Sequence, residues 1–219
     1  MWNSMKRKRS VRNRRARRCL FLILLALLAL LLIWPRTVHL EGLVSPYAIL
    51  VDADSGEAVA EKKADVSIYP ASITKVMTAL LALEANPDLV QPVTLPEDIF
   101  PELRAEGASM AGFRPGETAT VRDLLYGALL PSGAECCEAL AREVSGSEEA
   151  FVELMNQKAA ELGMRSTHFC NPTGLHDPEH VSTVRDMARL LRAAMQNETF
   201  RAILSAGRYA VQATDLHPE

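Results

Sequence analysis

The sequence predicts an α+β fold, chiefly from the order of its elements. Two strand-like segments, 47–52 and 57–61, come first and are separated by a turn at 53–56. A long block of helical patterns follows, and strand-like character returns only at 209–211. Strands grouped apart from helices are typical of α+β folds, whereas regular alternation indicates a parallel sheet.

The length and composition fit one good-sized domain behind an N-terminal extension. The chain has 219 residues, 48% of them hydrophobic and 23% charged. We expect a basic cytoplasmic tail over 1–18, a signal-anchor or transmembrane helix over 19–35, a linker over 36–46 and a folded domain over 47–219.

The N-terminal extension predicts a membrane anchor. Nine Lys or Arg residues lie between Lys6 and Arg18, and an apolar run follows over 20–34. With Cys19, a helix over this run spans about 24 Å, slightly less than a ~30 Å hydrocarbon core. No Ala-x-Ala-like cleavage site follows Trp34, so a retained anchor is favoured over a cleaved signal peptide. The basic cluster predicts a cytoplasmic N-terminus and a folded domain outside the cytoplasm, on the cell membrane, and no nucleic-acid partner.

Within the domain, prolines and helix-capping residues indicate where the helices begin and end. Pro70 and Ser72 mark the start of a helix to about residue 84 that is apolar nearly all round, which predicts burial. The stretch 86–116 is loop-rich because prolines interrupt it repeatedly. Thr120 and Asp123 resemble a capping box for a helix to about residue 130. Further helices are expected over 134–144, 147–162 and 183–196.

Ser72 and Lys75 form the candidate catalytic pair. Residues i and i+3 share one face of a helix, with Cβ atoms about 5–6 Å apart. The lysine amine can therefore sit beside the serine hydroxyl and serve as its base, which a serine needs to become a strong nucleophile. By itself a Ser-x-x-Lys sequence is common; its position at the start of a buried helix makes it a candidate site.

Several ordered segments resemble one family. They are Pro-Ala-Ser-Ile-Thr-Lys-Val-Met-Thr (70–78), Gly-Ala-Ser-Met (107–110), Arg-Pro-Gly-Glu (114–117), Asp-Leu-Leu-Tyr-Gly-Ala-Leu-Leu-Pro-Ser-Gly (123–133), and the segments 155–164 and 169–177. Over about 47–205, the chain resembles the D-alanyl-D-alanine carboxypeptidases, the low-molecular-mass penicillin-binding proteins.

The resemblance implies a fold and a chemistry. The fold is the transpeptidase/β-lactamase-like one, an antiparallel sheet packed by helices with a helical lobe, here C-terminally incomplete. Ser72 is implied as nucleophile, Lys75 as general base and Ser132 as proton relay, with Gly133 and Ala134 at the substrate. The implied partners are peptidoglycan stem peptides and inhibitory β-lactams, without cofactor or metal.

Two departures from the family pattern affect the expected activity. The family's Ser-x-Asn motif is here Ser132-Gly133-Ala134, and its Lys-Thr-Gly motif occurs nowhere in the chain. We interpret the second departure as truncation before that motif, and expect this 219-residue form to be impaired. The alternatives are a non-catalytic peptidoglycan- or partner-binding relative, and a serine β-lactamase of the same fold.

Cysteines and a His/Asp group raise two further possibilities. In an exported domain Cys170 is expected to form a disulfide with Cys136 or Cys137. A nearly equal alternative is that all three cysteines are free and act as small buried hydrophobic residues. His176, Asp177 and His180 are metal-ligand types, but no fourth ligand is evident and a metal site is not expected.

Overall fold

The domain begins with a two-stranded hairpin. The computed structural model describes residues 38, 40, 42–214, 216 and 217. In it β1 (Ala48–Val51) pairs antiparallel with β2 (Ala58–Lys62), which confirms both predicted strands to within a residue or two. Gly56 (φ +77°) lies in the connecting turn, where its backbone hydrogen-bonds to Asp52.

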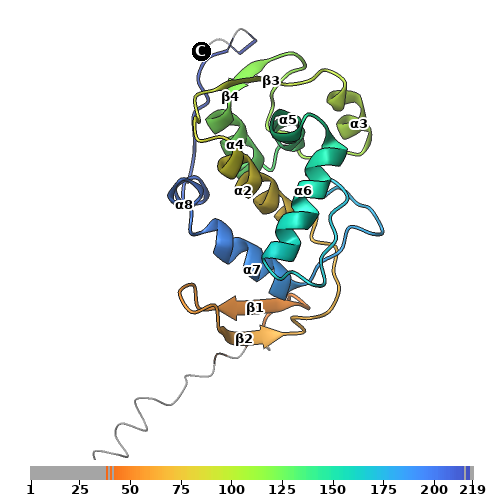
Figure 1. Ribbon diagram of the computed structural model, residues 1–219, viewed down its shortest axis with the longest axis vertical. Coiled ribbons are helices and arrows are strands. Elements are labelled where there is room, and N and C mark those ends of the chain that lie inside the picture. The colour runs from red at the N-terminus through yellow and green to blue at the C-terminus, as the bar shows by residue number, and fades with distance from the viewer. Residues whose placement is uncertain (1–37, 39, 41, 215, 218–219) are drawn as a thin grey trace, which may run out of the picture. The chain divides into compact units, whose positions relative to one another are not determined.

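The central helix of the domain carries Lys75 at its start. A short 3₁₀ helix, η1 (Ala71–Thr74), leads into α2 (Lys75–Ala85), whose side chains are almost all buried among the helices around it (Figure 1). The prediction of a buried helix is confirmed. Its start is corrected, because Ser72 lies on the 3₁₀ turn rather than in the first turn of the α-helix.

The stretch predicted to be loop-rich contains three regular elements. β3 (Pro92–Thr94) pairs antiparallel with β4 (Thr118–Thr120), and α3 (Ile99–Ala105) lies between them. Pro101 is the third residue of α3, where a missing N–H costs no intrahelical hydrogen bond. Pro101 therefore lies in the first turn of this helix without breaking it, which is why its presence misled the prediction.

Four predicted helices are confirmed, and three of them begin at a side-chain cap, of which the sequence suggested the one at Thr120. Thr120 and Asp123 form the capping box of α4, Ser147 caps α6 and Thr183 caps α7. The helices are α4 (Val121–Leu129), α5 (Ala134–Ser145), α6 (Glu148–Glu161) and α7 (Val184–Ala194).

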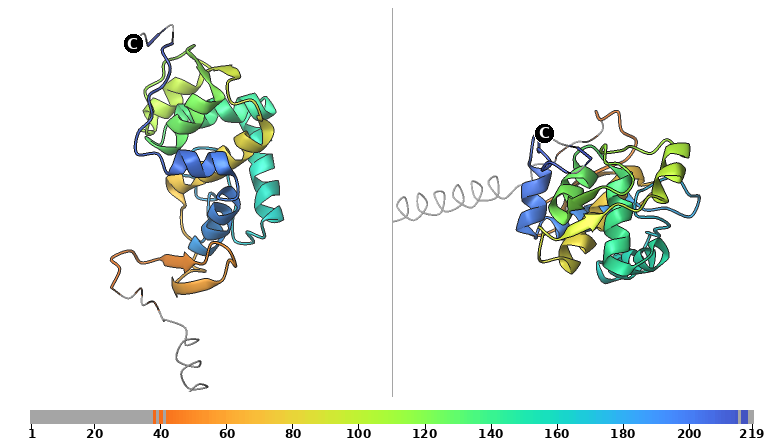
Figure 2. Two further views of the ribbon diagram at one scale, coloured as in Figure 1. Left: turned by 90° about the vertical axis from the view of Figure 1, so that its left-hand side faces the viewer. Right: turned by 90° about the horizontal axis from the view of Figure 1, so that it is seen from above.

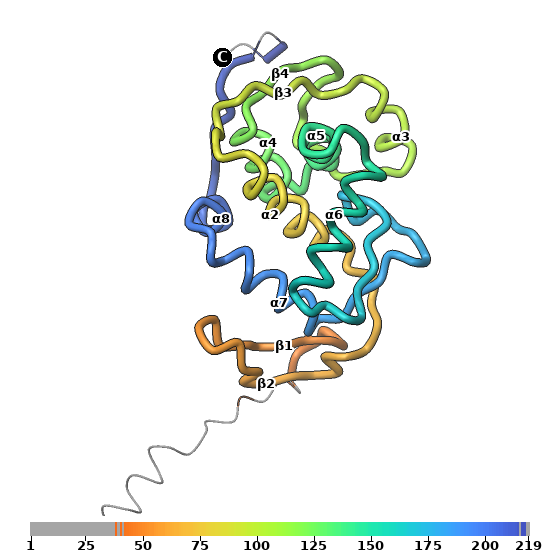
Figure 3. The backbone as a smooth tube through the Cα atoms, in the orientation of Figure 1, coloured from red at the N-terminus to blue at the C-terminus, as the bar shows by residue number. Residues whose placement is uncertain are grey.

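The C-terminal part differs from the prediction. A short helix, α8 (Glu198–Leu204), was not expected, and residues 209–211 do not form a strand. Instead the segment after α8 runs past α4 towards β3 and β4 (Figure 3). The ring of Tyr209 stacks on Tyr126 of α4 at 3.7 Å between centroids, so side-chain packing holds this segment.

The architecture is a mixture of helices and small antiparallel sheets. The hairpin β1–β2 lies at one end of the domain, β3–β4 at the other, and the helices pack between them (Figure 2). The predicted α+β class is confirmed. The expected single sheet is not found among the described residues, which contain two separate two-stranded sheets.

The predicted membrane segment, 19–35, lies outside the described residues, as do the basic tail and residues 36, 37, 39 and 41 of the linker. Within the part of the chain that the structure does describe, no helix combines the length and apolar character needed to cross a membrane.

Candidate active site

Ser72 and Lys75 are in contact, as the sequence predicts. Lys75 Nζ lies 3.3 Å from Ser72 Oγ. The lysine is only 4% exposed, whereas Ser72 is exposed to solvent. An accessible hydroxyl beside a buried amine is the arrangement expected of a nucleophile and its base.

A loop distant in sequence fixes the amine. Lys75 Nζ donates a 2.6 Å hydrogen bond to the carbonyl oxygen of Thr173, and Thr78 Oγ1 donates one of 2.6 Å to that of Pro172. Lys75 and Thr78 are i and i+3 on α2, so one face of the helix binds two successive carbonyls. The side chain of Lys75 is thus held between the Ser72 turn and this loop.

Asn171 shapes that loop. Its Oδ1 accepts hydrogen bonds from the N–H groups of Thr173 (3.2 Å) and Gly174 (2.7 Å), and its Nδ2 donates to the carbonyl of Leu175 (3.0 Å). These local bonds form an Asx-type turn that points the Thr173 carbonyl at the lysine. Asn171 and Thr173 were not predicted as site residues, although both lie in a segment, 169–177, that carries the family resemblance.

The same loop packs closely on the nucleophile turn. Ala71 adopts a positive φ of +48°, and a Cβ at Gly174 would lie only 1.9 Å from the Ala71 carbonyl oxygen. A non-glycine residue at positive φ costs about 1–2 kcal/mol. The strained turn before Ser72 is thus covered by a backbone that only glycine allows to approach so closely.

The electrostatic setting shifts the pKa of Lys75. Burial lowers the pKa of Lys75, the Glu135 carboxylate opposes that shift, and Cys137 would oppose it only as a thiolate. The Cys137 thiol is itself neutral at pH 7, because burial raises its pKa to about 12. A lowered lysine pKa makes the free amine more available as a base at neutral pH.

Ser132 lies on the connection between α4 and α5 in an unusual conformation. Its φ is +66°, and its Oγ is buried without a hydrogen-bond partner. A buried, unpartnered hydroxyl in a native fold needs an explanation, and a functional role is one.

Gly133 and Ala134, the expected substrate contacts, are both buried. The N–H of Gly133 donates to the Gly127 carbonyl and that of Ala134 to the Ser109 carbonyl, each at 2.8 Å. Both backbone donors are therefore occupied in this structure.

Glu135 follows directly and binds the loop opposite. Its Oε1 accepts from the N–H groups of Ala111 (2.7 Å) and Gly112 (2.9 Å), while its Oε2 is buried and unpartnered. Burial raises the pKa of Glu135, and the backbone donors oppose that shift. The carboxylate therefore positions the 111–112 loop.

The predicted disulfide is not formed: Cys136, Cys137 and Cys170 are free thiols. Cys136 and Cys137 are fully buried in α5. Cys136 Sγ packs against Gly127, so closely that a Cβ added at Gly127 would lie 2.6 Å from the sulfur. Cys170 Sγ instead lies 3.6 Å from His168 Nδ1. Cys136 and Cys137 therefore fit the alternative interpretation, in which the cysteines are small buried hydrophobic residues.

His180 has a structural role. Its Nδ1 accepts from the Cys170 N–H at 3.2 Å, so Nε2 carries the proton and donates to Thr74 Oγ1 at 2.9 Å. Both nitrogens are thus used. Across the described residues, no group of three or more His, Cys, Asp or Glu side chains is arranged to hold a metal ion.

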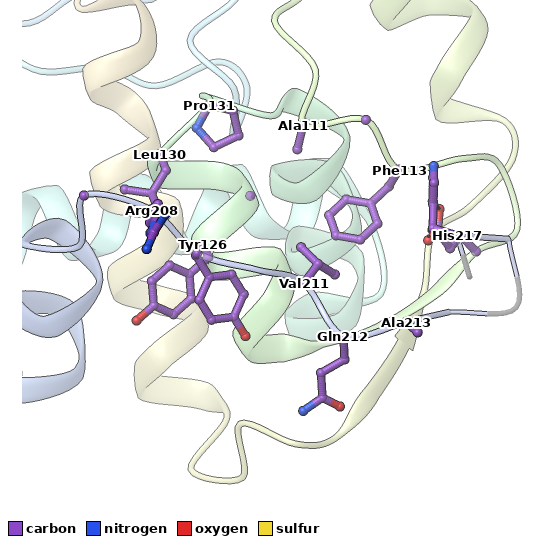
Figure 4. A pocket seen from close by; sticks show the side chains of 15 residues that line it. Ala111, Phe113, Tyr126, Leu130, Pro131, Arg208, Val211, Gln212, Ala213 and His217 are labelled. Atoms are coloured by element: carbon purple, nitrogen blue, oxygen red, sulfur yellow. Dashed lines mark hydrogen bonds and ion pairs between the residues drawn. The ribbon is translucent and has the colours of Figure 1, made fainter. Parts of the chain in front are cut away.

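A cavity of about 700 Å³ lies beside the Ser132 connection rather than at Ser72. It is bounded by the 111–113 loop, α4 and the C-terminal segment, and Phe113, Tyr126 and Val211 are among its lining residues (Figure 4). Neither Ser72 nor Lys75 lines it. The C-terminal segment, not the candidate catalytic pair, therefore defines this cavity.

Comparisons with known proteins place the chain in a family. The family model of the D-alanyl-D-alanine carboxypeptidases matches residues 36–212. The chain is 37% identical over 152 residues to D-alanyl-D-alanine carboxypeptidase DacF of Bacillus subtilis, covering 69% of this chain and 39% of the relative. It is 39% identical over 170 residues to DacC of Escherichia coli, covering 74% of this chain and 42% of the relative.

Solved structures show the same relationship. A variant of the Streptomyces K15 DD-transpeptidase superimposes with a TM-score of 0.75 at 31% identity, covering 80% of this chain and 70% of that one. The chain therefore belongs to the D-alanyl-D-alanine carboxypeptidase family and has its penicillin-binding fold. It spans about two fifths of the length of the two curated relatives, 39% and 42%.

Proposed function

We propose that this protein is a serine-type D-Ala-D-Ala carboxypeptidase that trims peptidoglycan stem peptides through an acyl-enzyme. The observation that carries the proposal is the buried Lys75 amine, placed between Ser72 Oγ and the Thr173 carbonyl. Family membership and the names of the relatives support the substrate class.

The proposed reaction has two steps. The neutral Lys75 amine takes the Ser72 proton as Oγ bonds to the carbonyl carbon of the penultimate D-Ala. The C–N bond then breaks, the terminal D-Ala amine leaves with a proton, and an ester to Ser72 remains. Water hydrolyses the ester, which releases the shortened peptide and restores the Ser72 hydroxyl.

Ser132 is proposed as the relay that passes the proton to the leaving amine. Its buried, unpartnered Oγ supports this role. Gly133 and Ala134 are proposed to shape the substrate side of this connection. Because Ala134 offers no amide, the contact that asparagine makes in the family is lost; one such contact is worth about 1–3 kcal/mol, or roughly five- to a hundredfold in rate.

The 219-residue chain contains no Lys-Thr-Gly sequence, and we propose that this form acylates slowly. In the resembled family that motif binds the substrate carboxylate and lines the oxyanion hole, and one oxyanion-hole donor is worth about 10²–10³ in rate. A longer form that carries the motif is expected to acylate faster by at least that factor. Equal rates for the two forms would refute this part of the proposal.

Labelling with a fluorescent penicillin tests the nucleophile. The longer form should be labelled covalently, Ser72→Ala should abolish the label, and the exposed control Ser205→Ala should leave it unchanged. Release of D-Ala from a D-Ala-D-Ala peptide should follow the same pattern. Labelling that survives Ser72→Ala would refute the assignment.

Two other functions make different predictions. A non-catalytic binding relative, favoured by Ala134 and the missing Lys-Thr-Gly sequence, retains peptidoglycan binding without penicillin labelling or D-Ala release. A serine β-lactamase hydrolyses penicillin with rapid turnover instead of holding it as a stable acyl-enzyme.

We also propose that residues 19–35 anchor the protein in the cell membrane with the domain on the extracytoplasmic side. The nine cations between Lys6 and Arg18 support this orientation. Protease added to wall-stripped intact cells should digest the domain and spare the tail; protection of the whole chain would contradict it. A mature N-terminus mapped between Pro35 and Tyr47 would show instead a cleaved signal peptide.

A further inference from the structure

A second cavity, of about 280 Å³, is strongly acidic. Its lining residues come from α3, α5, the start of α6 and the 170–177 loop, and Figure 1 shows how these helices are arranged. Its lining includes six carboxylate side chains and one guanidinium, that of Arg142. The carboxylates belong to Asp98, Glu102, Glu106, Glu138, Glu148 and Asp177. Ser72 and Lys75 do not line it, although Asn171 and Thr173, from the loop that holds Lys75, do.

Glu138 is the unusual member of this group. It is 5% exposed, and its Oε2 is buried without any hydrogen-bond partner. The neighbouring cation does not relieve it, because Arg142 binds both carboxylate oxygens of Asp98, at 2.8 and 3.0 Å. A buried carboxyl left unpaired is costly in either protonation state, since protonation removes the charge but leaves an O–H without an acceptor.

The groups around Glu138 indicate that the cavity lacks a positive charge. Burial, joined by the carboxylates of Glu148, Glu102 and Asp98 and opposed by the charge of Arg142, raises the pKa of Glu138 to about 8. Burial likewise raises the pKa of Glu148, with Glu102 and Glu149 adding to the shift. A cation in the cavity would reverse these shifts and supply the absent donor.

The geometry distinguishes between kinds of cation. Among the described residues, no three carboxylate, His or Cys side chains converge closely enough for one metal ion, so the acids surround a space instead of a point. Apolar side chains share the wall: Ile99 and Leu103 of α3, and Leu175 of the loop. A charged head on an alkyl stem matches both kinds of surface.

We propose that this cavity binds a primary alkylammonium group, with Glu138 accepting from the ammonium and Ile99, Leu103 and Leu175 packing on the alkyl chain. Two sources share this chemistry: the side chain of a diamino acid in a peptide, and a free polyamine. The site stands independently of the proposed carboxypeptidase activity, since none of its evidence comes from Ser72 or Lys75.

Calorimetric titration of the 219-residue chain with n-pentylamine at pH 7 tests the proposal. One molecule should bind, and uncharged 1-pentanol should bind at least about tenfold more weakly. Glu138→Gln preserves shape and removes the charge, so it should weaken n-pentylamine about tenfold, as should Glu148→Gln. The matched control Glu153→Gln, on the exposed face of α6, should change nothing.

Proton release provides a second measurement. Because Glu138 is mostly protonated at pH 7, ammonium binding should ionise it and release about one proton, seen as a heat that depends on the buffer. The charged or titratable groups that face it are Asp98, Glu102 and Glu106 on and beside α3, Arg142 of α5, Glu148 of α6, and Cys170, His176 and Asp177 of the loop. Glu138→Gln should abolish the release, and Glu153→Gln should retain it.

The affinities of Nα-acetyl-lysine amide and of cadaverine show which of the two sources supplies the alkylammonium group. Tighter binding of the first assigns the cavity to a peptide side chain, and tighter binding of the second to a polyamine; both support the proposal. Equal binding of 1-pentanol, unchanged affinity in both Glu138→Gln and Glu148→Gln, or binding of Ca²⁺ in place of n-pentylamine would overturn it.

Discussion

At the scale of single residues, buried polar side chains hold the backbone around Lys75. His180 bonds to Thr74, directly before the lysine, and to the N–H of Cys170, directly before Asn171. It is 2% exposed, and burial lowers its pKa from 6.5 to about 4. The neutral ring therefore connects the start of α2 to the loop that binds Lys75.

This histidine predicts a loss of stability in mild acid. Between about pH 6.5 and pH 4 the unfolded chain binds a proton that the folded chain does not, so the free energy of unfolding falls as the pH decreases through this window. The loss should reach about 3 kcal/mol. Urea unfolding at pH 7 and pH 4.5 measures it. In His180→Gln the difference between the two pH values should be smaller; an unchanged difference would contradict the assignment.

Glu135 predicts a contrast between two substitutions. Glu135→Ala removes the acceptor for the N–H groups of Ala111 and Gly112, and should lower the free energy of unfolding by about 1–3 kcal/mol. Glu135→Gln keeps an acceptor oxygen in place and should cost much less. Urea denaturation of both variants checks this. Equal losses would show that shape, not hydrogen bonding, is what Glu135 provides.

At the scale of elements, the approach of the 171–175 loop to the Ser72 turn is the most exacting contact. Gly174→Ala places a methyl group 1.9 Å from the Ala71 carbonyl oxygen and adds strain at φ +79°. Gly163 has a similar φ of +70° but open space around it, so Gly163→Ala reports the backbone strain alone.

The variants Gly163→Ala and Gly174→Ala together separate backbone strain from steric clash. Gly163→Ala should destabilise by about 1–2 kcal/mol, whereas Gly174→Ala should lose more, about 3 kcal/mol or above, because a steric clash adds to the strain. Thermal and urea unfolding provide the comparison. Equal losses would mean that the loop does not pack against Ala71 as closely as described.

At the scale of the whole domain, the C-terminal segment is fastened to the helices by few side chains. Tyr209 stacks on Tyr126, and its hydroxyl donates a 2.8 Å hydrogen bond to Oδ1 of Asp123, a residue that is 2% exposed. Asp123 also forms the capping box of α4 with Thr120. Tyr209 thus links the C-terminal segment to the start of α4, and Thr214 and His217 link it to Glu117.

This link predicts graded effects. Tyr209→Phe keeps the ring stack and loses a hydrogen bond to a carboxylate, at a cost of about 1.5–3 kcal/mol. Tyr209→Ala loses the stack as well, at a further cost of about 1 kcal/mol or more. Tyr69→Phe, at an exposed position, should stay within about 0.5 kcal/mol of the parent. A Tyr209→Ala variant as stable as the parent would show that the segment is not docked.

The sequence by itself determined the fold class, the first hairpin, the helices α4 to α7 and the contact between Ser72 and Lys75. These features depend on local signals: caps such as Thr120 and Thr183, the apolar pattern of α2, and a spacing of three residues. Local signals were misleading at Pro101, where proline lies in the first turn of a helix, and at 209–211, where the segment is held by the packing of Tyr209 without pairing as a strand.

Only the tertiary structure decided what holds the lysine and where the cysteines go. Thr173 lies 98 residues from Lys75 along the chain, and its contribution is a backbone carbonyl, which every residue possesses and no sequence pattern marks. Cys170 likewise could be paired or free on the sequence alone, and its neighbour proved to be His168. Such contacts depend on how distant segments pack, because backbone groups and free thiols acquire a role only from what is brought beside them.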